Sequence, residues 1–291
     1  MPVLPGFTDH IAPLPDGDIA YSRAGDGPPL LLLHGFPQTR KMWHGIAPAL
    51  AKTHTVIAAD LRGYGASFKP EGAAAMTFRL MARDQHRLMA SLGFEAFHLI
   101  GHDRGGRTAH RLALDAPQAV LSLTVMDIIP THTLLTQLSQ PVATAYYHWF
   151  FLAQPAPLPE RMIASDPDSY FESAFGAWGK GALEDFDPEA LAAYRASWRQ
   201  QETIHTMCND YRAGLLFDVN DDAADLEKRV TCPTLVAYGA DGAMARFYDV
   251  PATWAPKTDH MQSVALPGGH FFPDTHPNET RAALQAFLQS V

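Results

Sequence analysis

The chain has 291 residues, of which 47% are hydrophobic, and its formal net charge is −9. This length predicts one catalytic unit with a single large core and room for a smaller insertion. The negative charge and the absence of any Lys/Arg-rich run disfavour nucleic acid or an anionic membrane as a partner. No apolar run approaches the roughly 18 residues that span a bilayer, and residues 1–6 lack a basic flank followed by an apolar stretch, so we expect a cytoplasmic protein.

Short apolar runs alternate with amphipathic segments of helical length, a pattern typical of an α/β sheet. The predicted buried strands are residues 30–33, 55–60, 97–101, 121–127, 234–239 and 262–266. Each ends near Gly, Asp or His, and loops at such strand ends are where open α/β sheets bind ligands. The functional residues are therefore expected along one edge of the sheet.

The alternation stops between residues 130 and 214, where the chain becomes aromatic and helical, with one helix predicted at 189–199. We interpret residues 130–214 as a helical cap domain inserted into a core domain of residues 1–129 and 215–291. Leu284, Phe287, Leu288 and Val291 recur at helical spacing and predict a closing helix. The two cysteines, at 208 and 232, have no paired spacing, which argues against a disulfide framework or a zinc ribbon.

The turn Gly101-His102-Asp103-Arg104-Gly105-Gly106 follows a predicted strand and opens a predicted helical stretch at 107–116. This is the setting of a nucleophile elbow, in which serine is the commoner central residue. An aspartate, with a reference pKa of about 3.9, is already ionised at neutral pH. We therefore predict Asp103 as the nucleophile, although an aspartate before a helix is also a good N-cap.

A histidine in the expected position follows the last predicted strand, in the loop Gly268-Gly269-His270-Phe271. We predict that His270 is the base, oriented by an acid that is either Asp127 or Asp241, since each follows a predicted strand. The backbone amides of Phe36 and Arg104 are the candidate oxyanion donors. A simple Gly-Pro loop would also account for the sequence around Phe36.

Arg104 and Arg107 lie three residues apart at a helix start, so they project to one face. A cation at the N-terminus of a helix interacts unfavourably with the helix macrodipole. Such an unfavourable residue beside a nucleophile suggests a functional role. Two guanidiniums can bind a carboxylate through charge-assisted hydrogen bonds. The pair predicts a small carboxylic acid as substrate, the alternative being a solvated surface pair.

Over nearly its whole length the chain resembles the fluoroacetate dehalogenases, within the larger group of haloalkane dehalogenases and epoxide hydrolases. The arginine directly after the nucleophile is the discriminating feature, because relatives that act on neutral substrates typically have an aromatic residue there. The matching segments are His34-Gly35-Phe36-Pro37-Gln38, Asp60-Leu61-Arg62-Gly63-Tyr64-Gly65, Gly101-His102-Asp103-Arg104-Gly105-Gly106-Arg107, Asp127-Ile128-Ile129-Pro130-Thr131, His148-Trp149-Phe150-Phe151, Asp210-Tyr211-Arg212-Ala213-Gly214 and Gly268-Gly269-His270-Phe271.

The resemblance implies an α/β-hydrolase fold, with a mostly parallel sheet flanked by helices and a helical cap insertion. It also favours Asp127 over Asp241 as the acid, and it implies a homodimer. Its implied roles are Asp103 as nucleophile, His270 as base, Arg104 and Arg107 as carboxylate clamp, and His148, Trp149 and Tyr211 as halide site. Without it, His148 and Trp149 would be interpreted as part of an aromatic cap core.

We therefore expect a hydrolase that converts a haloacetate, with fluoroacetate as the substrate that the resemblance implies, to glycolate and halide through an aspartyl ester, with no cofactor and no metal. An epoxide hydrolase is the main alternative, with Tyr146, Tyr147 and Tyr211 available as donors, although Arg104 argues against it. A haloalkane dehalogenase and a non-catalytic ligand receptor are the others. The sequence does not rank the halogens.

Overall fold

A computed structural model describes residues 2–179 and 181–291 of the chain. Its central sheet has eight strands in the order β1-β2-β4-β3-β5-β6-β7-β8. Strands β3 to β8 pair in parallel, and β1 and β2 are antiparallel additions at one edge. The strands are β1 (Thr8–Ala12), β2 (Ile19–Ala24), β3 (Pro29–Leu33), β4 (Thr55–Ala59), β5 (Phe97–His102), β6 (Val120–Met126), β7 (Val230–Gly239) and β8 (Thr258–Leu266). The predicted fold class, a mostly parallel sheet flanked by helices, is confirmed.

All six predicted strands are present, but β1 and β2 were not predicted, and β7 and β8 each begin four residues earlier than expected. The first four residues of β1 are exposed, so this edge strand lacks the apolar run that marks the central strands. The early part of β8 is also polar and mostly exposed, so it too lacks an apolar run. Strands with one solvated face are easily missed when buried runs are the criterion.

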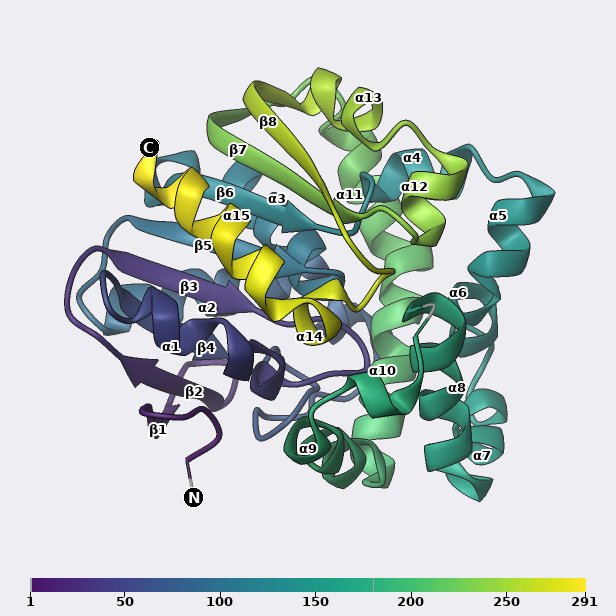
Figure 1. Ribbon diagram of the computed structural model, residues 1–291. Helices are drawn as coiled ribbons and strands as arrows, with labels where there is room; N and C mark the ends of the chain where they lie inside the picture. The colour runs from purple at the N-terminus through teal and green to yellow at the C-terminus, as the bar shows by residue number, and fades with distance from the viewer. Residues whose placement is uncertain (1, 180) are drawn as a thin grey trace.

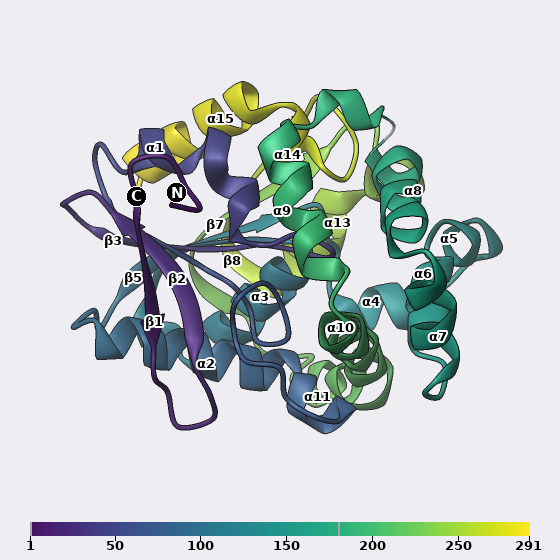
Figure 2. The ribbon, with the colours of Figure 1, turned by 90° about the horizontal axis from the view of Figure 1, so that it is seen from below.

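Helices cover both faces of the sheet, which gives three layers (Figures 1 and 2). One face carries α2 (Phe78–Ser91) and α3 (Arg104–Asp115), and the other carries α1 (Ala47–Leu50) and α15 (Pro277–Gln289). Leu284, Phe287 and Leu288 of α15 are buried, as predicted. Val291 is the exception: it lies beyond the helix and is 43% exposed, because α15 ends before it.

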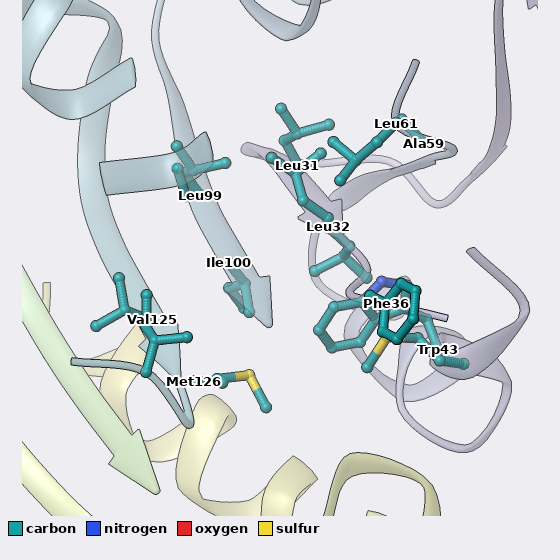
Figure 3. Close-up of a cluster of buried hydrophobic side chains, with 14 of the residues drawn as sticks. Leu31, Leu32, Phe36, Trp43, Ala59, Leu61, Leu99, Ile100, Val125 and Met126 are labelled. Atoms are coloured by element: carbon teal, nitrogen blue, oxygen red, sulfur yellow. The ribbon is translucent and has the colours of Figure 1, made fainter. Parts of the chain in front are cut away.

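The core lies around the central strands, which are buried on both faces and therefore read as continuous apolar runs. Leu30 to Leu33 of β3, for example, are all 0% exposed. Figure 3 shows the packed side chains of β3, β5 and β6 together with Phe36 and Trp43 of the loop and turn that follow β3. This packing fixes the carboxyl ends of β5 and β6, directly before Asp103 and Asp127.

A run of helices separates β6 from β7 and lies beside the carboxyl ends of the strands (Figure 1). It comprises α4 (Thr131–Thr136), α5 (Gln140–Ala145), α6 (Tyr147–Leu152), α7 (Leu158–Ser165), α8 (Pro167–Gly179), α9 (Pro188–Trp198) and α10 (Gln201–Ala213). We call residues 130–214 the cap segment, with the limits predicted from the sequence. Helical structure continues beyond it, through a π-helical turn (Gly214–Asp218) and α11 (Val219–Ala224).

Short helices complete the fold, and none of the helices in the described ranges is both long and apolar enough to cross a membrane. The short α-helices are α12 (Ala243–Phe247), α13 (Val250–Trp254) and α14 (Phe272–Thr275). The 3₁₀ helices are η1 (Arg40–Gly45), η2 (Ala73–Met76), η3 (Pro117–Ala119), η4 (Leu183–Asp185) and η6 (Ala255–Lys257).

Candidate active site

Asp103 stands alone between β5 and α3, with φ 48° and ψ −116°. This left-handed conformation is strained for a residue with a side chain, and such strain gathers at functional sites. The turn is tight enough that a Cβ atom at Gly101 would collide with the carbonyl oxygen of Gly105. Helix α3 begins at Arg104, three residues before the predicted start, and the Asp103 side chain makes no capping hydrogen bond. The carboxylate is thus not used as an N-cap.

The two carboxylate oxygens of Asp103 have different neighbours. Oδ1 accepts a hydrogen bond of 2.9 Å from the amide of Phe36, and Oδ2 lies 3.8 Å from Nε2 of His270. The amide of Arg104 belongs to the first turn of α3, where helix geometry leaves it without an intrahelical acceptor. Burial alone would raise the pKa of Asp103, but the charges of His270, His102 and Arg104 and the Phe36 amide lower it to about 2. Asp103 is therefore an anion at neutral pH.

The other face of His270 is held by Asp127, whose Oδ2 lies 2.6 Å from Nδ1. Asp127 follows β6, has φ 51°, and accepts a second hydrogen bond of 2.9 Å from the amide of Gly239. Burial lowers the pKa of His270, but the hydrogen bond and charge of Asp127, with the charge of Asp103, outweigh it and raise the pKa. Asp241, the other candidate, is exposed and accepts instead from the amide of Gly268 at 3.3 Å.

Arg104 and Arg107 are both buried, so they are not the solvated surface pair that the sequence left open. Each guanidinium carbon lies 4.9 Å from the centre of the Trp149 ring, so both cations lie against the same aromatic side chain. Arg107 donates from Nη1 to the carbonyl of Ile129 and to Oγ1 of Thr131, both at 3.0 Å. One nitrogen of each guanidinium, Nη1 of Arg104 and Nε of Arg107, is buried without a hydrogen-bond partner in the described structure.

Asp210 forms a buried ion pair with Arg104 that the sequence did not predict. Nε of Arg104 donates to Oδ2 of Asp210 at 2.9 Å, and Nη2 donates to its backbone oxygen at 2.8 Å and to Oδ1. The hydroxyl of Tyr64 donates to the same carboxylate at 2.5 Å. Both residues stand in the segments that carry the family resemblance, but nothing in their spacing indicated a contact with Arg104.

The predicted halide residues form one aromatic cluster. The centre of the Tyr211 ring lies 5.6 Å from the ring centre of His148 and 5.4 Å from that of Trp149, in edge-to-face arrangements. Nδ1 of His148 is buried without a partner in the described structure, and burial holds the pKa of this imidazole well below its usual range. Burial, with the charge of Asp103, raises the pKa of Tyr211. Both side chains are thus neutral at physiological pH and able to donate a hydrogen bond.

A cavity of about 220 Å³ lies in front of Asp103, and His270 and His148 also line it. Cap residues Tyr146, Tyr147 and Trp178 form one wall, while Asp241, Arg246 and Phe247 form part of the other. The predicted clamp arginines, Trp149 and Tyr211 do not line this cavity. They are almost wholly buried, at 0 to 3% exposure, and lie against one another.

Trp178 on α8 is a site residue that no pattern in the sequence indicated. The centre of its ring lies 3.9 Å from the ring centre of His148, and its backbone carbonyl oxygen accepts a 3.1 Å hydrogen bond from the amide of His270. A second unpredicted group joins the loops of Phe36 and His270 to the cap segment. There Asp274 accepts hydrogen bonds from Gln38 and, at 2.9 Å, from the hydroxyl of Tyr194.

Neither cysteine takes part in the site. Cys208 is buried, Cys232 is half-buried, and both are free. Burial raises the pKa of the Cys208 thiol to about 12 and that of Cys232 to about 11, so neither is a thiolate at neutral pH.

Comparison with known proteins places the chain among enzymes of this architecture. Residues 28–277 match the family model for the alpha/beta hydrolase fold. A fluoroacetate dehalogenase from Burkholderia sp is 50% identical over 97% of this chain and 94% of its own length. A soluble epoxide hydrolase from Corynebacterium sp. (strain C12) is 32% identical over 93% of each chain. The crystal structure of a putative alpha/beta hydrolase from Nostoc sp PCC 7120 superimposes with a TM-score of 0.95, at 45% identity, over 97% of this chain and 98% of that one.

Proposed function

Because the chain belongs to the α/β-hydrolase family, and within it to the group of the fluoroacetate dehalogenases, we propose that it hydrolyses the carbon–halogen bond of small 2-haloacids. A haloacetate would give glycolate and halide. The resemblance predicted from the motifs is confirmed by the identity to the Burkholderia protein. The homodimer that it also implies stays a prediction, which sedimentation would test.

The observation that carries the proposal is the pair of buried guanidinium nitrogens without acceptors, Nη1 of Arg104 and Nε of Arg107. Buried donors in native proteins are nearly always paired, so an unpaired couple beside a nucleophile is suited to bind an acceptor such as an anionic substrate. A carboxylate offers two acceptor oxygens and one negative charge, which suits two cationic donors. A haloalkane or an epoxide offers neither. These donors therefore favour a haloacid over the neutral substrates.

In the first step, Oδ2 of Asp103 attacks the α-carbon, a carbon–oxygen bond forms, and the carbon–halogen bond breaks with inversion. Oδ1 is held by the Phe36 amide, so Oδ2 is the oxygen free to attack. The halide leaves with the bonding electron pair toward His148, Trp149 and Tyr211, whose N–H and O–H groups stabilise its growing charge. For fluoride, a poor leaving group, such donors matter most.

In the second step, His270 removes a proton from water, and the resulting hydroxide adds to Cγ of the Asp103 ester. Oδ1 becomes the oxyanion, facing the amides of Phe36 and Arg104. The bond between Cγ and Oδ2 then breaks, Oδ2 takes the proton from His270, and glycolate leaves with Oδ2 as its hydroxyl oxygen. The charge of Asp103 helps to raise the pKa of His270 in the free enzyme. Esterification removes that charge, which lowers the pKa of His270 and so favours the neutral, basic imidazole.

The proposal is tested by measuring halide release from fluoroacetate and from chloroacetate. Turnover of styrene oxide is measured as a comparison with a neutral substrate. We expect both haloacids to react and the epoxide to remain. Cap tyrosines Tyr146 and Tyr147 line the cavity, so the epoxide is a fair competitor. Turnover of the epoxide alone would make the chain an epoxide hydrolase and refute the argument from the arginines.

The ester intermediate has its own test. A single turnover in ¹⁸O-labelled water should label Asp103, because the oxygen of the first glycolate comes from the carboxylate. The label is read by mass spectrometry of the peptide that contains Asp103 and of the product. Label in the first glycolate would show direct attack by water and would refute the covalent scheme while leaving the substrate assignment intact.

A further inference from the structure

The cavity in front of Asp103 is poor in positive charge where an anion would enter it. Its charged lining residues in the described structure are Asp103, Asp127, Asp241 and Arg246, besides the titratable imidazoles of His148 and His270. The described cap residues that line the cavity contribute no Asp, Glu, Lys or Arg; they are Thr144, Ala145, Tyr146, Tyr147, His148, Ala177 and Trp178. A haloacid in this cavity thus faces the carboxylate of the nucleophile and two others, on a chain whose net charge is −9.

Arg246 is the one guanidinium among the described lining residues, and it is not committed to another group. It lies on α12, is exposed, and its guanidinium carbon is 5.2 Å from the ring centre of Phe247. No carboxylate oxygen of the described residues lies within 4.0 Å of its nitrogens. Asp241, its acidic neighbour in the lining, is partly engaged, since its Oδ2 accepts the amide hydrogen of Gly268.

The clamp arginines cannot take over this function from where they lie. Arg104 is 0% and Arg107 3% exposed, and neither lines the cavity. An anion in the cavity therefore meets Arg246 before it reaches the buried pair. We propose that Arg246 is a specificity-determining residue that draws the carboxylate of the substrate into the cavity and so favours anionic over neutral haloacyl compounds at the binding step. This inference rests on the proposed dehalogenase function.

The charge of Arg246 should act on binding and not on chemistry, because it does not contact the reacting atoms. The test compares chloroacetate with the neutral chloroacetamide, in the full-length protein carrying Arg246→Gln, Arg246→Glu or Arg246→Lys. We expect KM for chloroacetate to rise about two- to fivefold in Arg246→Gln and further in Arg246→Glu, with kcat unchanged. Arg246→Lys should stay near the wild type. The effect should fade near 1 M salt, where the Debye length is about 3 Å.

Arg23 on β2 provides a matched control. It is also exposed, and its guanidinium carbon lies 5.6 Å from the ring centre of Phe94, in the same arrangement but away from the cavity. Arg23→Gln and Arg23→Glu should leave KM for both substrates unchanged. This control separates the position of the charge from the net charge of the protein.

Two results would overturn the inference while the dehalogenase function stands: an unchanged KM for chloroacetate in both Arg246→Gln and Arg246→Glu, or an equal rise in KM for chloroacetamide. The second would show that the side chain acts through its shape. If the wild-type protein released no halide from any haloacid, the proposed function itself would fall and take this inference with it.

Discussion

The two sides of the active site differ in how completely their polar atoms are paired. On the hydrolytic side, made up of Asp103, Asp127, His270 and the Phe36 amide, each carboxylate oxygen faces a donor or the imidazole. On the substrate side, made up of Arg104, Arg107 and His148, three buried nitrogens have no acceptor in the described structure. The fold itself thus pairs the carboxylates of the hydrolytic side, whereas the substrate side keeps three donors available for an acceptor.

This difference separates what the fold builds from what the substrate must supply. A preorganised hydrolytic group needs no rearrangement when the ester forms, which is where its catalytic advantage lies. Buried donors without acceptors cost free energy, and hydrogen bonds to an anion would offset that cost. Binding of a carboxylate and release of a halide would complete the substrate side, the first at the arginines and the second at His148.

Removal of the nucleophile should have the largest effect. Asp103→Asn keeps the side-chain shape, tolerates the left-handed φ and can still accept the Phe36 amide hydrogen, but it lacks the anionic Oδ2. We expect halide release to fall by about 10⁴-fold or more. Thermal unfolding checks that the variant folds like the wild type. Activity within tenfold of the wild type would show that water attacks carbon directly, and the hydrolytic side would need another role.

The choice between the two acids is the next largest test. Asp127→Asn removes the charge that orients His270 and raises its pKa, so ester hydrolysis should slow by about 10²- to 10⁴-fold. Because the first step does not need His270 as base, the ester on Asp103 should accumulate and be visible by mass spectrometry. Asp241→Asn is the control and should stay within a few-fold of the wild type. The opposite ranking would show that the pairing seen at His270 is not the catalytic one.

Arg104 is only partly paired. Its Nε and Nη2 donate hydrogen bonds to Asp210, whereas Nη1 has no acceptor in the described structure. Asp210→Asn would leave a buried cation without its counterion. We expect the free energy of unfolding to fall by about 3 kcal/mol. Tyr64→Phe, which removes one neutral hydrogen bond to the same carboxylate, should cost about 1 kcal/mol. Urea unfolding at neutral pH measures both, and equal losses would mean that the charge of Asp210 is unimportant.

The parts of the site that were predictable are those contained in short segments at strand ends. Asp103 and Arg104 are neighbours in one turn, and the buried strand before them and the helix after them are evident in the sequence. The choice between Asp127 and Asp241 was not predictable, because the two residues follow adjacent strands. Only the register of β6, β7 and the His270 loop decides which carboxylate contacts the imidazole.

Contacts between the core and the cap segment were beyond prediction for a different reason. Asp210 lies 106 residues from Arg104, and which acid meets a buried cation depends on how α10 packs against α3. The same holds for Trp178 on α8, which reaches His148 only through the packing of cap helices. The sequence pattern of one helix does not predict how that helix packs against another that is distant in the chain.

The group formed by Gln38, Asp274 and Tyr194, next to the hydrolytic side, should make the stability of the fold depend on pH. Asp274 is 5% exposed, and no Lys, Arg or His nitrogen of the described residues lies within 4.0 Å of it. Burial, reinforced by the charge of Asp187 and opposed by the hydrogen bonds of Tyr194 and Gln38, raises its pKa to about 7. In the unfolded chain the pKa is about 3.9, so folding favours the neutral acid.

A raised pKa stabilises the fold below the unfolded value, and that contribution is lost as the pH rises through the folded value. Asp274→Asn stays neutral at every pH, accepts from Tyr194 and can donate to Oε1 of Gln38, which has no partner in the described structure. Between pH 5.5 and 8.5 the stability of this variant relative to the wild type should rise by about 2 kcal/mol, measured by urea unfolding. Asp241→Asn, at an exposed site, should show no such change. A flat difference for Asp274→Asn would mean that Asp274 is ionised throughout this range, and that the amide of Gln38 and the hydroxyl of Tyr194 suffice to hold a buried anion between the His270 loop and the cap segment.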